Sequence, residues 1–330
     1  MSMTIDIRVP VGLPVKETAK FIGLCETVGF NGVGVHDHQH SGRDVFVTLA
    51  LAAEQTEHLR LYPVTSNPIT RHPAVLASLA HTLEEIAPER VLLTIGPGFL
   101  SVGNIGHPRA TLHEMRHTFN TIKGLLRGET IPMGTTQSRM RNTSVKPTPV
   151  YMTAAGPEMI KLAGEVADGV MLRVGLHPNA ISAARKLLQD GATRSGRTLQ
   201  DFPTIFIVDM SIDSDGTTSR RWPQRWMSPT LPWLHYPSKA NFRWFRESGI
   251  DLPRNISPDQ ITDDIAERIS DVFGLFGTPQ QCAESLIRAR DEAGAEHIFV
   301  FPVHSIEGGY DMPIPEIAAF RDIIFPRLTS

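Results

Sequence analysis

The segment His36-Asp37-His38-Gln39-His40 brings five titratable or hydrogen-bonding side chains together. An imidazole with a pKa near its ordinary value of about 6.5 can hold or release a proton at neutral pH, and it can hydrogen-bond to a redox-active ring. A metal site would need further ligands, and no matching set is evident elsewhere in the sequence. We therefore expect proton transfer or ring recognition, with His38 as the catalytic candidate and Asp37 positioning it or contacting the ring. His40 is a candidate for substrate contact, with capping of the next helix as its structural alternative.

A second polar segment, Val64–Pro73, lies between an apolar run and the helical pattern Ala74–Ala87. Turn formation and helix initiation would explain Asn67 and Arg71 without any ligand, because Asn side chains commonly stabilise turns. Ligand binding is the functional alternative. The candidates for that contact are the residues at the start of the segment, Val64, Thr65, Ser66 and Asn67.

Two further segments are rich in small residues. Gly96-Pro97-Gly98-Phe99 allows a ligand to approach the backbone closely through Gly96 and Gly98, although two glycines alone are weak evidence, and Phe99 would border the substrate. Ala154-Ala155-Gly156-Pro157 precedes a helical pattern, so its backbone N–H groups would face outward at the positive end of a helix dipole. We expect a phosphate there, and tight packing between a strand and a helix is the structural alternative.

Short β-branched runs alternate with helical patterns along the whole chain, which is the signature of repeated βα units around a parallel sheet. Helices such as Val15–Val28 and Pro279–Ala293 are each followed by glycine, Gly29 and Gly294. The eight expected strands are Thr4–Val9, Val33–His36, Arg60–Thr65, Val91–Gly96, Val150–Thr153, Gly169–Arg173, Thr204–Ser211 and His297–Phe301. We predict one α/β domain over residues 1–330, a (β/α)8 TIM barrel. A doubly wound sheet is less consistent, because no Gly-x-Gly-x-x-Gly follows the first strand.

Two segments interrupt the alternation. Arg127–Pro149 is rich in Gly, Thr and Pro and is expected to be a long loop, and residues 216–257 are expected to form a lid inserted between the seventh and eighth strands. All four tryptophans and several arginines of the chain lie in this lid, and Trp222, Arg225 and Trp226 are its candidate substrate contacts. Aromatic faces and guanidinium groups suit a flat or anionic ligand, and a subunit contact would have the same composition.

Composition restricts the partners. A net charge of −3 gives no global attraction to nucleic acid or to an anionic membrane, so we expect a small-molecule partner. The N-terminus lacks the features of a signal peptide, and no apolar run approaches the roughly 18 residues of a membrane span. We therefore expect a cytoplasmic protein, in which Cys25 and Cys282 are buried, reduced thiols.

The string Asn67-Pro68-Ile69-Thr70-Arg71-His72-Pro73-Ala74 resembles the coenzyme F420-dependent branch of the luciferase-like superfamily, notably methylenetetrahydromethanopterin reductases and F420-dependent glucose-6-phosphate dehydrogenase. Glu165-Val-Ala-Asp-Gly and Phe276-Gly-Thr-Pro-Gln resemble the same branch. The resemblance implies a non-prolyl cis peptide behind the coenzyme ring, at Val64–Thr65 or Thr65–Ser66, and a coenzyme phosphate at Ala154–Pro157. It also implies a homodimer. One departure is Phe99, which stands where the family has an acidic residue.

Three functions follow, in order of preference. The first is a deazaflavin-dependent oxidoreductase that transfers hydride between coenzyme F420 and a small substrate, with His38 and Asp37 at the ring. The second is an FMN-dependent monooxygenase that works with a separate flavin reductase. The third, suggested by the missing acid at Phe99, is a barrel that binds ligand without turnover.

Overall fold

The computed structural model describes residues 3–224, 239–253, 256–303 and 310–329. Its main sheet contains eight parallel strands in the order β3-β2-β1-β11-β9-β8-β7-β4. Isolated parallel bridges, Leu61 to Val91 and Ser66 to Ile95, join β3 to β4 and nearly close the ring, so the predicted (β/α)8 barrel is confirmed. The strands are β1 (Thr4–Val9), β2 (Gly32–Val35), β3 (Arg60–Pro63), β4 (Leu93–Ile95), β7 (Val150–Ala154), β8 (Gly169–Leu172), β9 (Thr204–Ile212) and β11 (His297–Pro302).

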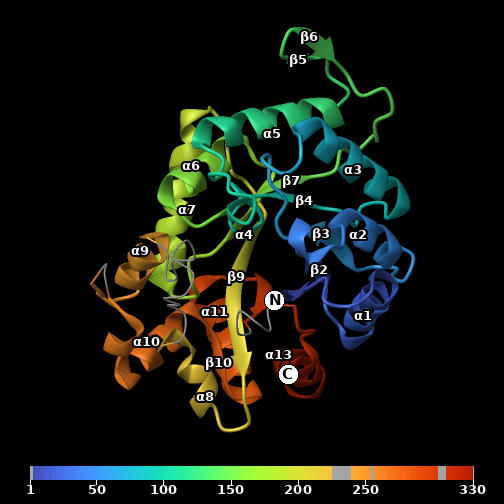
Figure 1. The fold of residues 1–330 in the computed structure, drawn as a ribbon. Coiled ribbons are helices and arrows are strands. Elements are labelled where there is room, and N and C mark those ends of the chain that lie inside the picture. Colours follow the sequence, from blue (N-terminus) through green and yellow to red (C-terminus); the bar gives the residue numbers. More distant parts are fainter. Residues whose placement is uncertain (1–2, 225–238, 254–255, 304–309, 330) are drawn as a thin grey trace.

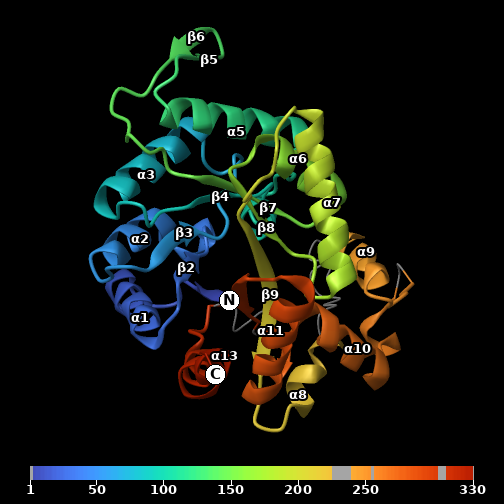
Figure 2. The ribbon, with the colours of Figure 1, turned by 180° about the vertical axis from the view of Figure 1, so that it is seen from behind.

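Helices surround the strands in Figures 1 and 2. The longer helices are α1 (Val15–Val28), α2 (Val45–Ala53), α3 (Pro73–Ile86), α5 (Leu112–Leu126), α6 (Pro157–Val166), α7 (Pro178–Arg194), α9 (Lys239–Glu247), α10 (Asp263–Phe273) and α11 (Pro279–Ala293). The short ones are η1 (Gln39–Ser41), α4 (Leu100–Gly103), α8 (Thr217–Arg220), η2 (Trp222–Gln224), η3 (Pro258–Gln260), α12 (Ile314–Ala319), the π turn η4 (Phe320–Ile324) and α13 (Phe325–Thr329).

Local sequence explains where several helices begin and end. Thr278 and Gln281 form a reciprocal capping box at the start of α11, which satisfies two backbone N–H groups that would otherwise lack partners. Gly294 then ends the helix with a φ of 61°, a left-handed conformation that suits glycine. Gly29 ends α1 in the same way with a φ of 110°. The predicted boundaries of both helices are therefore confirmed.

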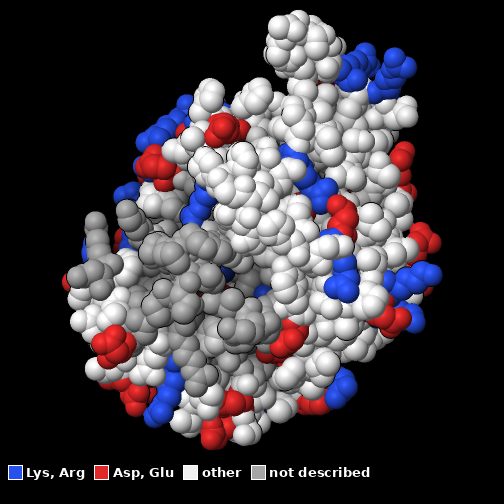
Figure 3. All heavy atoms as spheres, viewed as in Figure 1, with Lys and Arg blue, Asp and Glu red and all other residues white. Residues whose placement is uncertain are grey.

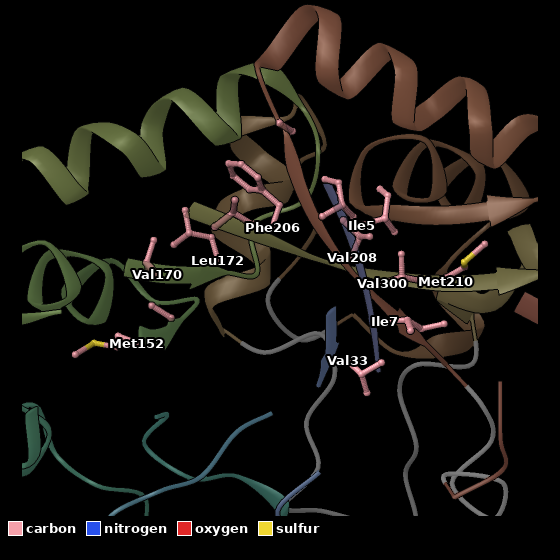
Figure 4. Close-up of a cluster of buried hydrophobic side chains, with 14 of the residues drawn as sticks. Ile5, Ile7, Val33, Met152, Val170, Leu172, Phe206, Val208, Met210 and Val300 are labelled. Atoms are coloured by element: carbon pink, nitrogen blue, oxygen red, sulfur yellow. The ribbon is translucent and has the colours of Figure 1, made fainter. Parts of the chain in front are cut away.

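The strands are buried on both faces. One face packs against the helices, and the ten side chains labelled in Figure 4 belong to it and come from β1, β2, β7, β8, β9 and β11. The other face fills the barrel with a second cluster that includes Tyr62, Met171, Ile207 and Phe299. Each such side chain contributes about 1.5–3 kcal/mol on burial. Gly34 makes room for the rings, because a Cβ there would lie 2.7 Å from Phe299.

Some expectations were wrong in detail. The predicted loop Arg127–Pro149 contains a short antiparallel hairpin, β5 (Ile131–Met133) with β6 (Thr136–Ser138). A strand that was not predicted, β10 (Gly274–Gly277), pairs with the end of β9. It was missed because four residues of Gly-Leu-Phe-Gly carry no visible alternation. Both cysteines are buried and free, as expected.

The described part of the expected lid forms α8, η2 and α9. Arg225 and Trp226 lie outside the described residues, so the lid itself stays a prediction. No helix in the described part of the chain has the length and apolarity needed to span a bilayer.

Candidate active site

The segments that follow β2, β3, β4 and β7 carry most of the candidate residues. Because all of these strands are parallel, their carboxyl ends lie at one end of the barrel, where barrel enzymes assemble their sites. In Figure 1, α4, which follows β4, lies in front of the strands. Figure 3 shows the same face with a hollow near its centre, and atoms of basic residues are visible inside the hollow.

Asp37 is buried and its carboxylate is occupied by protein donors. Arg71 donates two hydrogen bonds of 2.8 Å, from Nε to Oδ2 and from Nη2 to Oδ1. The Ser66 hydroxyl donates to Oδ2, and the Gln39 amide donates to Oδ1 at 3.0 Å. Arg71 also reaches Asp44 at 2.7 Å. Asp37 therefore ties the end of β2 to the segment after β3.

His38 lies against two other ring-bearing side chains, those of Tyr310 and His36. Its Nδ1 lies 3.3 Å from the Tyr310 hydroxyl, and its ring stacks on His36 with centroids 4.9 Å apart. Burial is the largest cause that lowers the pKa of His38, and it lowers the pKa of His36 well below the usual value, with Arg8 acting in the same direction on both. Both imidazoles are therefore neutral at neutral pH. His40 lies exposed in η1.

The segment after β3 contains a cis peptide between Val64 and Thr65, which is the first of the two positions predicted. Ser66 continues toward β4, since its N–H donates to Thr94 O at 3.1 Å and its carbonyl accepts from Gly96 N at 2.9 Å. A Cβ on Gly96 would lie 2.9 Å from Thr65 Oγ1, so a larger residue there would displace the Thr65 side chain. This region brings Thr65, Ser66 and Gly96 together.

Asn67 is fully buried and acts inside its own turn. Its Oδ1 accepts from the backbone N–H groups of Ile69 at 3.0 Å and Thr70 at 2.9 Å, and its Nδ2 donates to Ser101 Oγ at 3.2 Å. These contacts match the turn-forming alternative and give Asn67 the role of supporting the segment.

Gly98 has a φ of 88° and leads into Phe99 at the start of α4. The Phe99 ring packs beneath the Arg109 guanidinium, whose Cζ lies 4.3 Å from the ring centroid, a cation–π distance. Phe99 thus offers an aromatic face where an acidic side chain would offer a proton.

No side chain caps the backbone N–H groups in the first turn of α6. Gly156 is the residue that precedes the helix. A Cβ on Gly156 would meet no atom within 4 Å, whereas Ala154 is buried in the strand. On the other side of the loop, Trp244 Nε1 donates to Ala155 O at 2.8 Å. The geometry suits an anion at these N–H groups, with Trp244 holding the loop from behind.

The floor of the barrel at this end contains side chains that were not predicted. The Cζ atoms of Arg8 and Arg173 lie 4.6 Å and 5.4 Å from the Phe301 ring, and Arg173 donates to both carboxylate oxygens of Asp209. Alternate residues of each strand face the barrel interior, so following this alternation to the last interior position of each strand would have identified them. Within the described residues, two further buried polar atoms at this end, His36 Nδ1 and Thr153 Oγ1, have no hydrogen-bond partner.

No group of three or more His, Cys, Asp or Glu side chains in the described ranges is arranged to hold a metal ion. Trp222 is partly buried against the core, and the other lid candidates, Arg225 and Trp226, are not among the described residues.

Comparison with known proteins supplies the family context. A model of the luciferase-like monooxygenase family matches residues 3–297. The chain is 33% identical to 5,10-methylenetetrahydromethanopterin reductase of Methanolobus tindarius over 66% of this chain and 68% of that protein. It is 30% identical to F420-dependent glucose-6-phosphate dehydrogenase of Beutenbergia cavernae over 62% of this chain and 66% of that protein. The fold is similar to the coenzyme F420-dependent tetrahydromethanopterin reductase of Methanopyrus kandleri, with a TM-score of 0.69, 21% identity and coverage of 96% and 100% of the two chains.

Proposed function

The chain belongs to the luciferase-like monooxygenase family, and on that basis we propose that it is a coenzyme F420-dependent oxidoreductase acting on a small organic substrate. The observation that carries the proposal is His38, a partly buried imidazole at the end of β2 whose pKa burial lowers, and which lies beside His36 and the Tyr310 hydroxyl. The chain's 30% identity to an F420-dependent dehydrogenase supports the choice of coenzyme. A neutral histidine can accept a proton while hydride moves in the opposite direction.

The residues at the strand ends fit such a coenzyme. Unpartnered buried polar atoms, among the described residues, at His36 and Thr153 offer hydrogen bonds to the polar edge of a flat ring, and Gly156 offers open space beside backbone N–H groups. When bound, the deazaflavin would give or take a hydride. The residues that would hold its ring are Val64, Thr65, Ser66, Gly96 and Gly98, and those that would hold its phosphate are Ala154, Ala155, Gly156 and Pro157.

In this proposal His38 holds or moves the proton at its Nε2. Asp37 acts as a positioning residue, because its carboxylate is already engaged by Arg71 and Ser66. Asn67 keeps the turn after β3 in shape. The pair of guanidinium groups around Phe301 favours a substrate that is flat or anionic.

FMN is the competing coenzyme, because the family takes its name from monooxygenases. Reduced FMN reacts with oxygen readily, whereas a reduced deazaflavin does not, so the two functions separate in one experiment. The protein is mixed with reduced coenzyme F420 or reduced FMN, with and without oxygen, and with a panel of ketones, aldehydes and aromatic acids. Substrate-dependent oxidation of F420 without oxygen supports the proposal. Oxygen-dependent product formation with FMN alone would replace it with the monooxygenase.

A barrel without turnover is the remaining alternative. It predicts that His38→Ala leaves coenzyme binding intact and has no activity to remove. Loss of a measured turnover in His38→Ala, with binding retained, excludes it.

We also propose that the protein is a homodimer, the commonest closed assembly. Light scattering tests this, because a homodimer has twice the mass of one chain.

A further inference from the structure

Phe99 leaves the proposed reaction without an acidic side chain at that position, so a proton taken up by His38 needs another route to solvent. Tyr310 contacts His38 and carries an exchangeable hydroxyl proton. The two rings meet edge to face, with centroids 6.3 Å apart and planes at 76°, and the Tyr310 hydroxyl lies 3.3 Å from His38 Nδ1. With Nδ1 next to Tyr310, the other ring nitrogen, Nε2, is the one that the proposal assigns to the substrate.

The backbone of Tyr310 is closely packed against Gly12, whereas the residue remains partly exposed to solvent. A Cβ on Gly12 would lie 1.9 Å from Tyr310 O, so the chain after β11 packs directly against the segment after β1. This close approach requires glycine at position 12. The Tyr310 residue is still 38% exposed. A side chain held at its base and open to solvent is suited to exchange protons with water.

We propose that Tyr310 is a proton-relay and positioning residue for His38. The inference rests on the proposed function. When a substrate hydroxyl is oxidised, the electron pair leaves with the hydride for the coenzyme and the hydroxyl proton passes to His38 Nε2. The proton on Nδ1 then passes to the Tyr310 oxygen, and the Tyr310 hydroxyl proton passes to water. One proton enters the pair and one leaves it, and in the reverse reaction each step runs backward.

Several titratable groups lie near this pair. Asp37 directly precedes His38, His40 lies two residues after it, and His36 stacks on its ring. Arg8 on β1 acts electrostatically on both His38 and Tyr310. Burial raises the pKa of Tyr310, which keeps the phenol protonated at neutral pH, while burial lowers the pKa of His38. A neutral phenol beside a neutral imidazole can shift protons in either direction without leaving a charge behind.

Two variants of Tyr310 separate relay from packing. Tyr310→Phe removes only the hydroxyl and keeps the ring contact, whereas Tyr310→Leu removes both. The relay predicts that both variants lose at least about tenfold in kcat with little change in KM for coenzyme. It also predicts a larger solvent deuterium effect on kcat and a shifted acidic limb of the pH profile in Tyr310→Phe. If Tyr310→Phe matches the wild type in kcat, pH profile and isotope effect, the proposal is overturned, whether or not Tyr310→Leu is impaired.

A second measurement does not need turnover. Nitrogen NMR of labelled histidine reports the tautomer and titration of His38 in the free protein, assigned with His38→Gln. The relay predicts that Tyr310→Phe changes both, while His58→Gln, an exposed residue at the opposite end of the barrel just before β3 begins, changes neither. Unchanged His38 signals in Tyr310→Phe would overturn the proposal. If the wild type shows these coupled signals but binds no F420, the proposed function fails while the coupling stands.

Discussion

The guanidinium of Arg71 holds the buried carboxylate of Asp37 through two parallel hydrogen bonds of 2.8 Å. Fork-to-fork pairing of this kind fixes both orientation and distance. Asp37 directly precedes His38, and Arg71 lies in the same segment as the Val64–Thr65 cis peptide. The pair therefore sets the relative position of the catalytic candidate and the expected ring support.

Removal of Arg71 is therefore expected to destabilise the fold and weaken coenzyme binding. Arg71→Met leaves a buried carboxylate without its cation, which costs about 3–5 kcal/mol, and urea unfolding measures the loss. Arg321→Met is the control, because both side chains of its pair with Asp322 are more than half exposed, at 59% and 54%, and such a pair contributes at most about 1 kcal/mol. Adding Asp37→Asn to Arg71→Met should recover part of the loss. Equal effects of the two arginine variants would contradict this role.

Ionised Asp6 stabilises the fold, and this stabilisation is expected to be lost in acid. Burial raises its pKa, but His297, Arg60 and the Tyr62 hydroxyl together outweigh burial and hold the pKa below its usual value. A lowered folded pKa gives stability that is complete above the unfolded value of about 3.9 and is lost as pH falls through the folded value. Asp6→Asn should thus be less stable at pH 7 and less sensitive to acid below about pH 4. Asp322→Asn, in an exposed pair, should keep the wild-type acid profile.

Trp244 supports the loop that is expected to bind the coenzyme phosphate. Trp244→Phe removes the hydrogen bond to Ala155 O, which contributes about 0.5–1.5 kcal/mol, so KM for coenzyme should rise several-fold with kcat nearly unchanged. Trp222→Phe is the matched control, because the buried Trp222 Nε1 has no partner among the described residues. A fall in kcat without a change in KM would place Trp244 in a different role.

Gly156 offers a direct test of the phosphate site. Its φ is −85° and a Cβ there meets no atom within 4 Å, so side chains are tolerated. Gly156→Asp should leave the melting temperature unchanged or slightly raised, since a carboxylate suits a helix N-terminus, yet it should weaken F420 binding at least about tenfold by repelling the phosphate. Gly156→Asn is the neutral control. Equal loss of affinity for a deazaflavin riboside that lacks the phosphate would argue against a phosphate at this loop.

The strands and helices could be predicted from local sequence patterns, whereas the polar contacts between segments could not. Eight strands were predictable because each is a short apolar run followed by a helical pattern, whereas β10 was too short to show a pattern. The sequence placed Asp37 and Asn67 at a ligand, but their partners come from other segments, Arg71 and Ser101, which only the folded chain brings near. Arg8 and Asp209 lie inside predicted strands, and their role on the barrel floor depends on which face turns inward.

The most direct test of the central claim is a titration of the protein with coenzyme F420 and, separately, with oxidised and reduced FMN, followed by tryptophan fluorescence. Trp244 contacts the loop expected to hold the phosphate and should report binding there. We predict saturable binding of F420 that is at least about tenfold tighter than that of either form of FMN, with the signal strongly reduced in Trp244→Phe. Tighter binding of reduced FMN, or no saturable binding of F420, would contradict the assignment of the deazaflavin coenzyme.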